Sequence, residues 1–335
     1  MNARRLTSSL LIVLSMVLVS ALGLACQPSS NITTQPATAT DEQPSATHSF
    51  TPTSLPPTNT PSPTPARFSG ERAYADVEYQ VALGPRLPGS QAHDQAIQWM
   101  LAELQANDWQ TELQETSYGG QDIRNVIAKR SPAGETHRPW ILLGAHFDTR
   151  LWASEEPDPT NQTKPVPGAN DGASGVAVLL ELARVLPRDL DKQVWLVFFD
   201  AEDQGQIPGW DWILGSRAFA ESLTAFPDAV VIVDMIGDAD LNLYYERNSN
   251  QELSIELWSL AAELGYGQQF QPTPKYSILD DHTPFLERGI PAVDIIDFDY
   301  PYWHTLEDTP DKVSPDSLLA VGDTLQHWLD PQLER

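Results

Sequence analysis

The sequence predicts an α/β protein, a three-layer α/β/α sandwich around a central sheet that is mixed and mostly parallel. Short apolar runs typical of buried strands alternate along the chain with longer segments of helical spacing, which places helices on both faces of a sheet. The clearest strand is residues 194–199, which lead directly into Asp200, Glu202 and Asp203. Open α/β sheets bind ligands at that end of their parallel strands. Carboxylates packed so closely repel one another unless a cation or a shared proton compensates, so this end of the sheet is a candidate site.

The predicted elements follow from local patterns along the chain. Helical spacing predicts helices at residues 73–83 and 91–107, the second with an N-cap at Ser90. Pro139 stands where a strand tolerates it, directly before the apolar run 140–145. The other predicted strands are residues 110–115, 124–129, 229–235 and 292–296. The other predicted helices are an apolar, buried helix at 175–186, one beginning near 215, and those at 251–264 and 314–329.

The composition limits the classes of partner. The 335 residues are enough to bury a full hydrophobic core, and 46 acidic against 20 basic residues give a formal net charge of −26. This charge argues against a nucleic-acid partner, whereas a metal site or a cationic substrate fits it. We expect its main cause to be the solubility of an exported protein.

The N-terminal segment predicts export. Arg4 and Arg5 precede the apolar run 6–25, which ends in small residues before Cys26, the one cysteine of the chain. This order predicts a signal peptide at residues 1–25 and lipidation of Cys26, with an uncleaved anchor helix as the alternative. In either case the body of the protein lies outside the cytoplasm and meets a membrane only through this anchor. A single cysteine also excludes an intramolecular disulfide framework.

The rest of the chain divides into two segments of different composition. Residues 26–66 consist largely of Pro, Thr and Ser with almost no large apolar side chains, so they are expected to form a disordered stalk. Residues 67–335 contain the predicted elements, with no internal repeat and no second change of composition. We therefore expect one catalytic domain over 67–335, in a monomeric protein.

Five segments at strand ends or in loops carry side chains that can bind a metal. The strand 140–145 leads into His146, whose ring a nearby carboxylate such as Asp148 can orient. The other four segments contribute Asp171, the pair Glu202 and Asp203, Asp234, and His304. Each alone has a structural explanation, since Asp171 can be a helix N-cap and His304 a surface histidine. Their joint occurrence at strand ends favours a metal site.

These segments resemble the metal centre of metallopeptidase family 28, the zinc aminopeptidases, and most closely its glutaminyl cyclase branch. The resemblance extends from about residue 74 to the C-terminus and rests on residues 145–148, 170–175, 199–203, 234–237 and 303–305. The residues that match the ligands of the zinc ion common to both branches are Asp171, Asp203 and His304. The resemblance further implies that His146 and Asp234 bind a second zinc ion in an aminopeptidase, and that Glu202 is the general acid/base.

The chemistry of these residue types agrees with that assignment. Zinc takes nitrogen and oxygen ligands in a tetrahedral arrangement, and three protein ligands leave one position for water or substrate. Because Glu202 and Asp203 are adjacent, Asp203 can bind the metal while Glu202 moves protons to and from the substrate. Two positions depart from the family pattern: Asp203 is one methylene shorter than the usual Glu, and Asp294 replaces a His of many animal cyclases.

Three features favour the cyclase branch over the aminopeptidases. The segment 204–214 bears two tryptophans and resembles a loop of the cyclases. Trp303 directly precedes His304, as in the cyclases, where the indole shapes a small substrate pocket. Residues 279–285 resemble the cyclase segment whose aspartate, here Asp280, joins a hydrogen-bond network.

The resemblance to the cyclases also implies a metal count and a substrate site. Asp280 would share protons with Asp234, so the expected content is one zinc ion per chain, against two in an aminopeptidase. The residues expected to contact the substrate are Trp303, Trp210 and His282. For Trp212 we expect ordinary packing.

The sequence therefore predicts a zinc-dependent glutaminyl-peptide cyclotransferase, which acts on peptide N-termini and converts N-terminal Gln to pyroglutamate with release of ammonia. A two-metal zinc aminopeptidase stays open as an alternative because His146 is present. A weaker alternative is a non-catalytic binding lipoprotein, although such a protein has no need of a general acid/base like Glu202.

Overall fold

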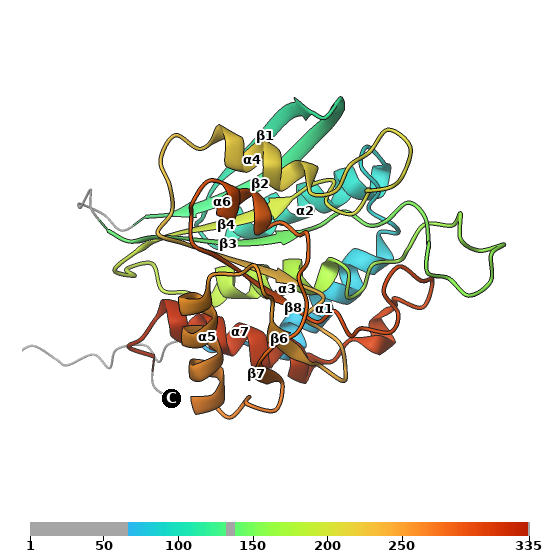
Figure 1. The fold of residues 1–335 in the computed structure, drawn as a ribbon. Helices are drawn as coiled ribbons and strands as arrows, with labels where there is room; N and C mark the ends of the chain where they lie inside the picture. Colours follow the sequence, from blue (N-terminus) through green and yellow to red (C-terminus); the bar gives the residue numbers. More distant parts are fainter. Residues whose placement is uncertain (1–65, 132–137, 334–335) are drawn as a thin grey trace, which may run out of the picture. The chain divides into compact units, whose positions relative to one another are not determined.

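The computed structural model describes residues 66–131 and 138–333, and Figure 1 shows their fold. The predicted signal peptide at 1–25, Cys26 and the stalk up to residue 65 lie outside the described residues. The described residues all belong to one compact unit, residues 61–335. Within the two described ranges, no helix combines the length and the apolar character needed to cross a membrane.

A six-stranded sheet forms the middle layer of the fold. Its strands are β1 Gln110–Tyr118, β2 Gln121–Arg130, β3 Trp140–His146, β4 Gln193–Phe199, β5 Ala229–Asp234 and β8 Ala292–Ile296. They are arranged in the order β1-β2-β4-β3-β5-β8. The pairings β4-β3, β3-β5 and β5-β8 are parallel, whereas β1 and β2 join antiparallel. The predicted mixed, mostly parallel sheet is confirmed.

The β1–β2 hairpin is longer than the sequence predicted. Its pairing continues as far as Tyr118 opposite Gln121. The turn between them is Gly119-Gly120, whose φ angles are 59° and 85°. Because glycine reaches positive φ without a Cβ clash, a two-residue turn of this kind keeps the strands paired up to the turn itself.

Helices cover both faces of the sheet, as predicted. They are α1 Gly70–Ala82, α2 Gln91–Ala106, α3 Ala173–Val185, α4 Leu214–Ser222, α5 Gln251–Glu263, α6 Thr283–Glu287 and α7 Pro315–Leu329. On one face α1, α2, α3, α5 and α7 share a core with Leu143 and Val231 of the sheet. On the other face Phe219 of α4 and Phe285 of α6 pack on Leu142. Figure 1 shows α4 and α6 on one side of the sheet and α5 and α7 on the other.

The burial of the strands explains their composition. Every residue of β5 and of β8 is buried, as expected for parallel strands with helices on both faces. A separate pair of short parallel strands, β6 Leu243–Tyr245 and β7 Phe270–Pro274, was not predicted. Strands of that length are too short for a periodic pattern to reveal.

The carboxyl ends of the parallel strands carry the candidate site residues. His146 is the last residue of β3, Asp234 is the last residue of β5, and Asp200 directly follows β4. Asp171 lies in the loop just before α3. The parallel arrangement therefore brings segments distant in sequence to one edge of the sheet, where α/β sheets bind ligands.

Candidate active site

Asp171, Asp203 and His304 form a cluster that could hold a metal ion, which we call the Asp203 cluster. One ligand atom from each residue lies within 4.8 Å of the others. The Nε2 atom of His304 is 2.9 Å from Oδ1 of Asp203 and 3.7 Å from Oδ2 of Asp171. All three side chains are buried. The structure thus brings together the three residues predicted as ligands of the first zinc ion.

The donor atoms of the Asp203 cluster fit a zinc ion. Within the described part of the chain, Oδ2 of Asp171 and Oδ2 of Asp203 are buried and have no hydrogen-bond partner. Buried carboxylate oxygens without partners are costly unless a cation compensates them. Together with an imidazole nitrogen they make the mixed nitrogen and oxygen set that zinc binds.

A second cluster shares Asp171 and consists of His146, Asp171 and Asp234; we call it the Asp234 cluster. The Nε2 atom of His146 lies 3.1 Å from Oδ1 of Asp171 and 3.1 Å from Oδ1 of Asp234. Burial alone would lower the pKa of the His146 imidazole, but Asp234, Asp148 and Asp171 raise that pKa well above its usual value. A protonated His146 would therefore already compensate the carboxylates of this cluster.

Asp148 connects the end of β3 to the loop that follows β4. Its carboxylate accepts the backbone N–H of Glu202 at 2.9 Å and that of Asp203 at 3.3 Å. It also lies 3.5 Å from Nδ1 of His146. Burial would raise the pKa of Asp148, but the neighbouring His146 and these donors lower it, so the carboxylate is ionised. Asp148 thereby orients His146, as the sequence indicated, and also positions the acidic pair.

The Asp171 loop is held by Asp308, to which sequence reasoning gave no role. Asp308 accepts the backbone N–H of Asn170 at 2.8 Å and that of Asp171 at 3.2 Å. The hydroxyl of Tyr300 donates to Oδ1 of Asp308 at 2.8 Å. Burial, with a further contribution from Asp171, raises the pKa of Asp308 to about 7. The position of Asp308, four residues after His304, was the signal available in the sequence.

Three non-glycine residues at the site have left-handed backbone conformations. The φ angles are 52° at Ala201, 47° at Met235 and 54° at His304. Such conformations cost on the order of 1–3 kcal/mol each and persist where the surroundings impose them. Ala201 precedes Glu202 and Met235 follows Asp234, so the strain lies where strand ends turn functional side chains towards the cavity.

Glu202 has the environment of a proton-exchanging carboxyl group. Its side chain lines the same cavity as the Asp203 cluster, and the residue is 8% exposed. Burial raises the pKa of Glu202 well above its usual value; His146 opposes this shift, while Asp203 and Asp280 add to it. A carboxyl group with a raised pKa can both take and return a proton near neutral pH.

A cavity of about 260 Å³ opens above the Asp203 cluster. Its floor contains Asp171, Glu202, Asp203, Asp234, Asp280 and His304. Its walls are largely apolar and include Trp212, Met235, Tyr276, Ile278, Leu279, Ile296, Phe298 and Trp303. The indole of Trp303 stacks on the His304 ring at 3.8 Å between centroids. A small apolar cavity with a few polar groups at its base is the usual form of a small-ligand site.

The structure reverses the predicted roles of two tryptophans. Trp210, predicted to contact the substrate, does not line the cavity and packs against Ile123 and Leu214 instead. Trp212, predicted to have a packing role, lines the cavity and stacks on His304 with ring centroids 6.1 Å apart and planes 10° apart. Neither role follows from a periodic pattern, because the loop that carries them is irregular.

His282 was also predicted to contact the substrate, but it is not among the residues that line the cavity. The His282 side chain is fully buried and is not part of the cavity wall. Its Nε2 lies 3.2 Å from Oε2 of Glu246, and its Nδ1 lies 3.6 Å from Oδ2 of Asp294. His282 therefore supports the loop behind the cavity.

Asp280 lines the cavity and lies within a group of buried carboxylates that also includes Asp234 and Asp294. Burial raises the pKa of Asp234 to about 7; His146 opposes this shift and Asp280 adds to it. Burial, Asp280 and Asp234 also raise the pKa of Asp294 well above its usual value. Carboxyl groups this close cannot all be ionised, so they hold protons between them.

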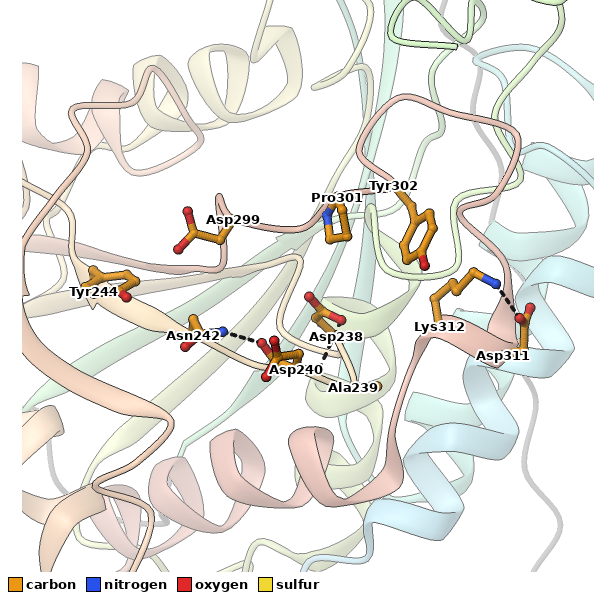
Figure 2. Close-up of a pocket in the computed structure, with 10 residues that line it drawn as sticks. All are labelled: Asp238, Ala239, Asp240, Asn242, Tyr244, Asp299, Pro301, Tyr302, Asp311 and Lys312. Atoms are coloured by element: carbon orange, nitrogen blue, oxygen red, sulfur yellow. Dashed lines mark hydrogen bonds and ion pairs between the residues drawn. The ribbon is translucent and has the colours of Figure 1, made fainter. Parts of the chain in front are cut away.

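A second, larger cavity of about 700 Å³ is lined by other residues. Figure 2 shows its lining: Asp238, Ala239, Asp240, Asn242, Tyr244, Asp299, Pro301, Tyr302, Asp311 and Lys312. It contains no residue of either metal cluster and not Glu202. The chemistry therefore belongs to the smaller cavity.

Comparisons with known proteins agree with this geometry. The model of the family described as Peptidase family M28 matches residues 125–329. A glutaminyl-peptide cyclotransferase of Boiga irregularis is 28% identical over 287 residues, which cover 72% of this chain and 75% of that protein.

Solved structures of two kinds resemble the fold. The glutaminyl cyclase of Porphyromonas gingivalis has a TM-score of 0.74 and 33% identity, covering 79% of this chain and 99% of that one. A leucine aminopeptidase precursor of Bacteroides thetaiotaomicron has a TM-score of 0.73 and 30% identity, covering 79% and 97%. Fold similarity alone therefore does not separate the two activities.

Proposed function

The chain belongs to peptidase family M28, and from this premise we propose that it is a zinc-dependent glutaminyl-peptide cyclotransferase. It would convert the N-terminal Gln of peptides to pyroglutamate and release ammonia. The observation that carries the proposal is the enclosure of His304 by Trp212 and Trp303 at the base of a small apolar cavity. Such a cavity suits one terminal side chain. The named cyclotransferase and cyclase relatives support the same choice.

The residues divide the reaction between them. Asp171, Asp203 and His304 would hold the zinc ion, which would supply Lewis-acid chemistry to the reaction. Glu202 takes a proton from the α-amino group as its nitrogen forms a bond to Cδ of the same glutamine. Glu202 returns the proton to the amide nitrogen as the bond from Cδ to that nitrogen breaks. The nitrogen leaves as ammonia, and no water is consumed.

The surroundings of Glu202 support this proton transfer. Burial raises the pKa of Glu202, so its carboxyl group binds a proton more tightly than an exposed carboxylate does. The walls of the cavity are largely apolar, and surroundings poor in water favour attack by the substrate's own amine over hydrolysis. Protons shared by Asp234, Asp280 and Asp294 would keep the negative charge near the substrate low.

A zinc aminopeptidase is the second candidate because the Asp234 cluster also has three suitable ligand atoms. The similarity to a leucine aminopeptidase precursor favours it as well. A second metal ion would require Asp234 to be ionised and His146 to be neutral. Nε2 of His146 already lies 3.1 Å from a carboxylate oxygen of Asp171 and 3.1 Å from one of Asp234, so we propose a single zinc ion per chain.

The proposed activity can be tested with two dipeptides. The zinc-loaded protein is incubated with one dipeptide that begins with Gln and one that begins with Leu, and the products are followed by mass spectrometry. Loss of ammonia from the Gln dipeptide, with the Leu dipeptide unchanged, is the expected result. Release of free leucine would establish the aminopeptidase instead.

We further propose that the protein is exported and held at the membrane by a lipid on Cys26, as a monomer outside the cytoplasm. The order of charged, apolar and small residues before Cys26 supports this proposal. Metabolic labelling of cells with a radioactive fatty acid should label the wild-type protein and not Cys26→Ala. Equal labelling of both proteins would contradict lipidation at that residue.

A further inference from the structure

Arg150 is a buried cation beside the Asp203 cluster. It lies in the loop that follows β3, and the residue is only 3% exposed. Its Nη1 donates to the backbone carbonyl of Asp203 at 3.1 Å and lies 3.3 Å from Oδ1 of the same residue. Its Nη2 donates to the backbone carbonyl of Gly205 at 3.1 Å. The guanidinium thus holds both the backbone and the carboxylate of a proposed ligand.

The same guanidinium also forms part of the support for the cavity wall. Its Cζ lies 4.8 Å from the ring centroid of Trp212. The same indole also stacks on the ring of His304, as described above. Arg150, Trp212 and His304 therefore form a continuous series of contacts.

A third contact leads from Arg150 to the other nitrogen of His304. Nε of Arg150 donates to Oγ of Ser154 at 3.2 Å, and this oxygen lies 3.4 Å from Nδ1 of His304. A partner at Nδ1 fixes the orientation of the ring, so that Nε2 is directed at Asp203 and Asp171. Arg150 therefore acts on two of the three proposed ligands.

The length of Asp203 makes this support important. An aspartate is one methylene shorter than a glutamate, so the position of its oxygens depends more directly on its backbone. Arg150 fixes that backbone through the carbonyl and limits the rotation of the carboxylate through Oδ1. Lysine would replace it only in part, because an ammonium lacks the planar, fork-shaped set of donors with which the guanidinium contacts two carbonyls and the indole together.

We propose that Arg150 is a positioning residue that places Asp203 and His304 for metal binding and holds Trp212 in the cavity wall. The effect on substrate binding rests on the proposed function, whereas the effect on metal binding does not depend on which reaction is catalysed. Removal of groups that orient metal ligands typically lowers metal affinity or activity about 10–100-fold.

Arg130 provides a matched control. It is also a buried arginine, 9% exposed, and its Cζ lies 4.0 Å from the ring centroid of Trp109. It donates to the backbone carbonyls of Leu186 and Asn107, both at 2.7 Å. Within the described ranges, its partners belong to neither metal cluster. Replacing Arg130 therefore removes a buried arginine that contacts an indole, and it changes no contact with either metal cluster.

The test compares Arg150→Met, Arg150→Lys and Arg130→Met with the wild-type protein. Zinc affinity is measured by titrating the metal-free protein in competition with a chromophoric chelator. Thermal unfolding of the metal-free protein gives the stability of each variant. For the zinc-loaded protein, kcat and KM are determined separately with a Gln-initiated dipeptide.

We expect Arg150→Met to weaken zinc binding about 10–100-fold and to raise KM, with a smaller loss in Arg150→Lys. Arg130→Met should lower the unfolding temperature and leave zinc affinity unchanged. Wild-type zinc affinity in Arg150→Met, or equal weakening in Arg130→Met, would overturn the proposal.

If Arg150→Met does not fold, wild-type zinc affinity and KM in Arg150→Lys would overturn it. If the wild-type protein releases leucine instead of cyclising Gln, the proposed function fails while the comparison of zinc affinities still decides the role of Arg150.

Discussion

The two metal clusters share Asp171 and have the same ligand types, but their surroundings differ. The Asp203 cluster is bordered by a buried arginine and two indoles, and Oδ2 of Asp203, which belongs to this cluster alone, has no hydrogen-bond partner among the described residues. The Asp234 cluster is bordered by further carboxylates, and its histidine already contacts both of its aspartates at 3.1 Å.

This difference shows that residue type alone does not make a metal site. In the Asp203 cluster the unpaired oxygens require a cation, and the apolar wall of the cavity gives the substrate access to it. In the Asp234 cluster, Nε2 of His146 lies 3.1 Å from a carboxylate oxygen of Asp171 and 3.1 Å from one of Asp234, and burial raises the pKa of Asp234 to about 7. We therefore propose that one edge of the sheet carries a metal site and a proton-sharing site next to each other.

The largest expected effect comes from replacing the histidine of one metal cluster or of the other. His304→Asn removes a ligand of the Asp203 cluster and should abolish both zinc binding and turnover. His146→Asn is the same chemical change in the Asp234 cluster, and it should retain one zinc ion per chain. Inductively coupled plasma mass spectrometry after dialysis measures the metal, and circular dichroism checks the fold. If zinc is lost from His146→Asn alone, the metal binds at the Asp234 cluster and the assignment to the Asp203 cluster is wrong.

The next largest effect concerns the acid/base group between the clusters. Glu202→Gln keeps the size of the side chain but cannot exchange protons, so turnover should fall about 10²–10⁴-fold. Zinc content should not change, because Glu202 belongs to neither cluster. Steady-state kinetics and metal analysis of the same preparation check both statements. Turnover within a factor of a few of the wild type would exclude Glu202 as the proton carrier.

A smaller effect distinguishes the wall of the Asp203 cluster from ordinary packing. Trp212→Ala should raise KM about tenfold, which corresponds to ~1.4 kcal/mol of binding free energy. Trp210→Ala should leave KM unchanged and lower the free energy of unfolding by up to about 3 kcal/mol, because its indole packs in a side core. Kinetics and urea unfolding separate the two. A raised KM in Trp210→Ala alone would restore the role that the sequence suggested.

The smallest expected effect is on the pH dependence of stability, through Glu246 in the region behind the Asp234 cluster. Burial would raise the pKa of Glu246, but His282 and the backbone N–H groups of Ile278 and Asn248 lower it to about 2. The folded-state pKa is thus below the usual value of 4.5, so the stability contributed by Glu246 is present above pH 4.5 and is lost as pH falls towards 2.

Glu246→Gln should therefore destabilise the protein above pH 4.5, by about 1–2 kcal/mol once solvent screening is allowed for. The difference from the wild type should shrink between pH 4.5 and pH 2. Thermal unfolding of both proteins across that range measures it. A difference that is independent of pH would show that Glu246 contributes no charge-dependent stability.

The sequence allowed the sheet and the ligand sets to be predicted because both depend on strong local patterns. Buried parallel strands are short apolar runs, and β4 leads directly into its acidic pair. The ends of parallel strands meet at one edge, so His146 and Asp234 had to lie close together once the topology was right.

The rest depended on irregular backbone, which has no periodic pattern. Whether Trp210 or Trp212 faces the cavity is determined by a loop that contains left-handed residues at Gln206 and Ile213. His282 resembled a substrate contact, yet it lies 3.2 Å from Glu246, which directly follows a strand too short to predict. Arg150 follows His146 closely in the sequence, but its contacts with Asp203 arise only when two loops meet.

Anomalous diffraction at the zinc absorption edge, from crystals grown with excess zinc, tests most directly whether zinc binds at the Asp203 cluster alone. We expect one zinc peak, bounded by Asp171, Asp203 and His304, and no peak beside His146. Two peaks of equal occupancy, the second between His146 and Asp234, would contradict it. Such a result would mean that the Asp234 cluster is a working metal site and that the protein has the centre of an aminopeptidase.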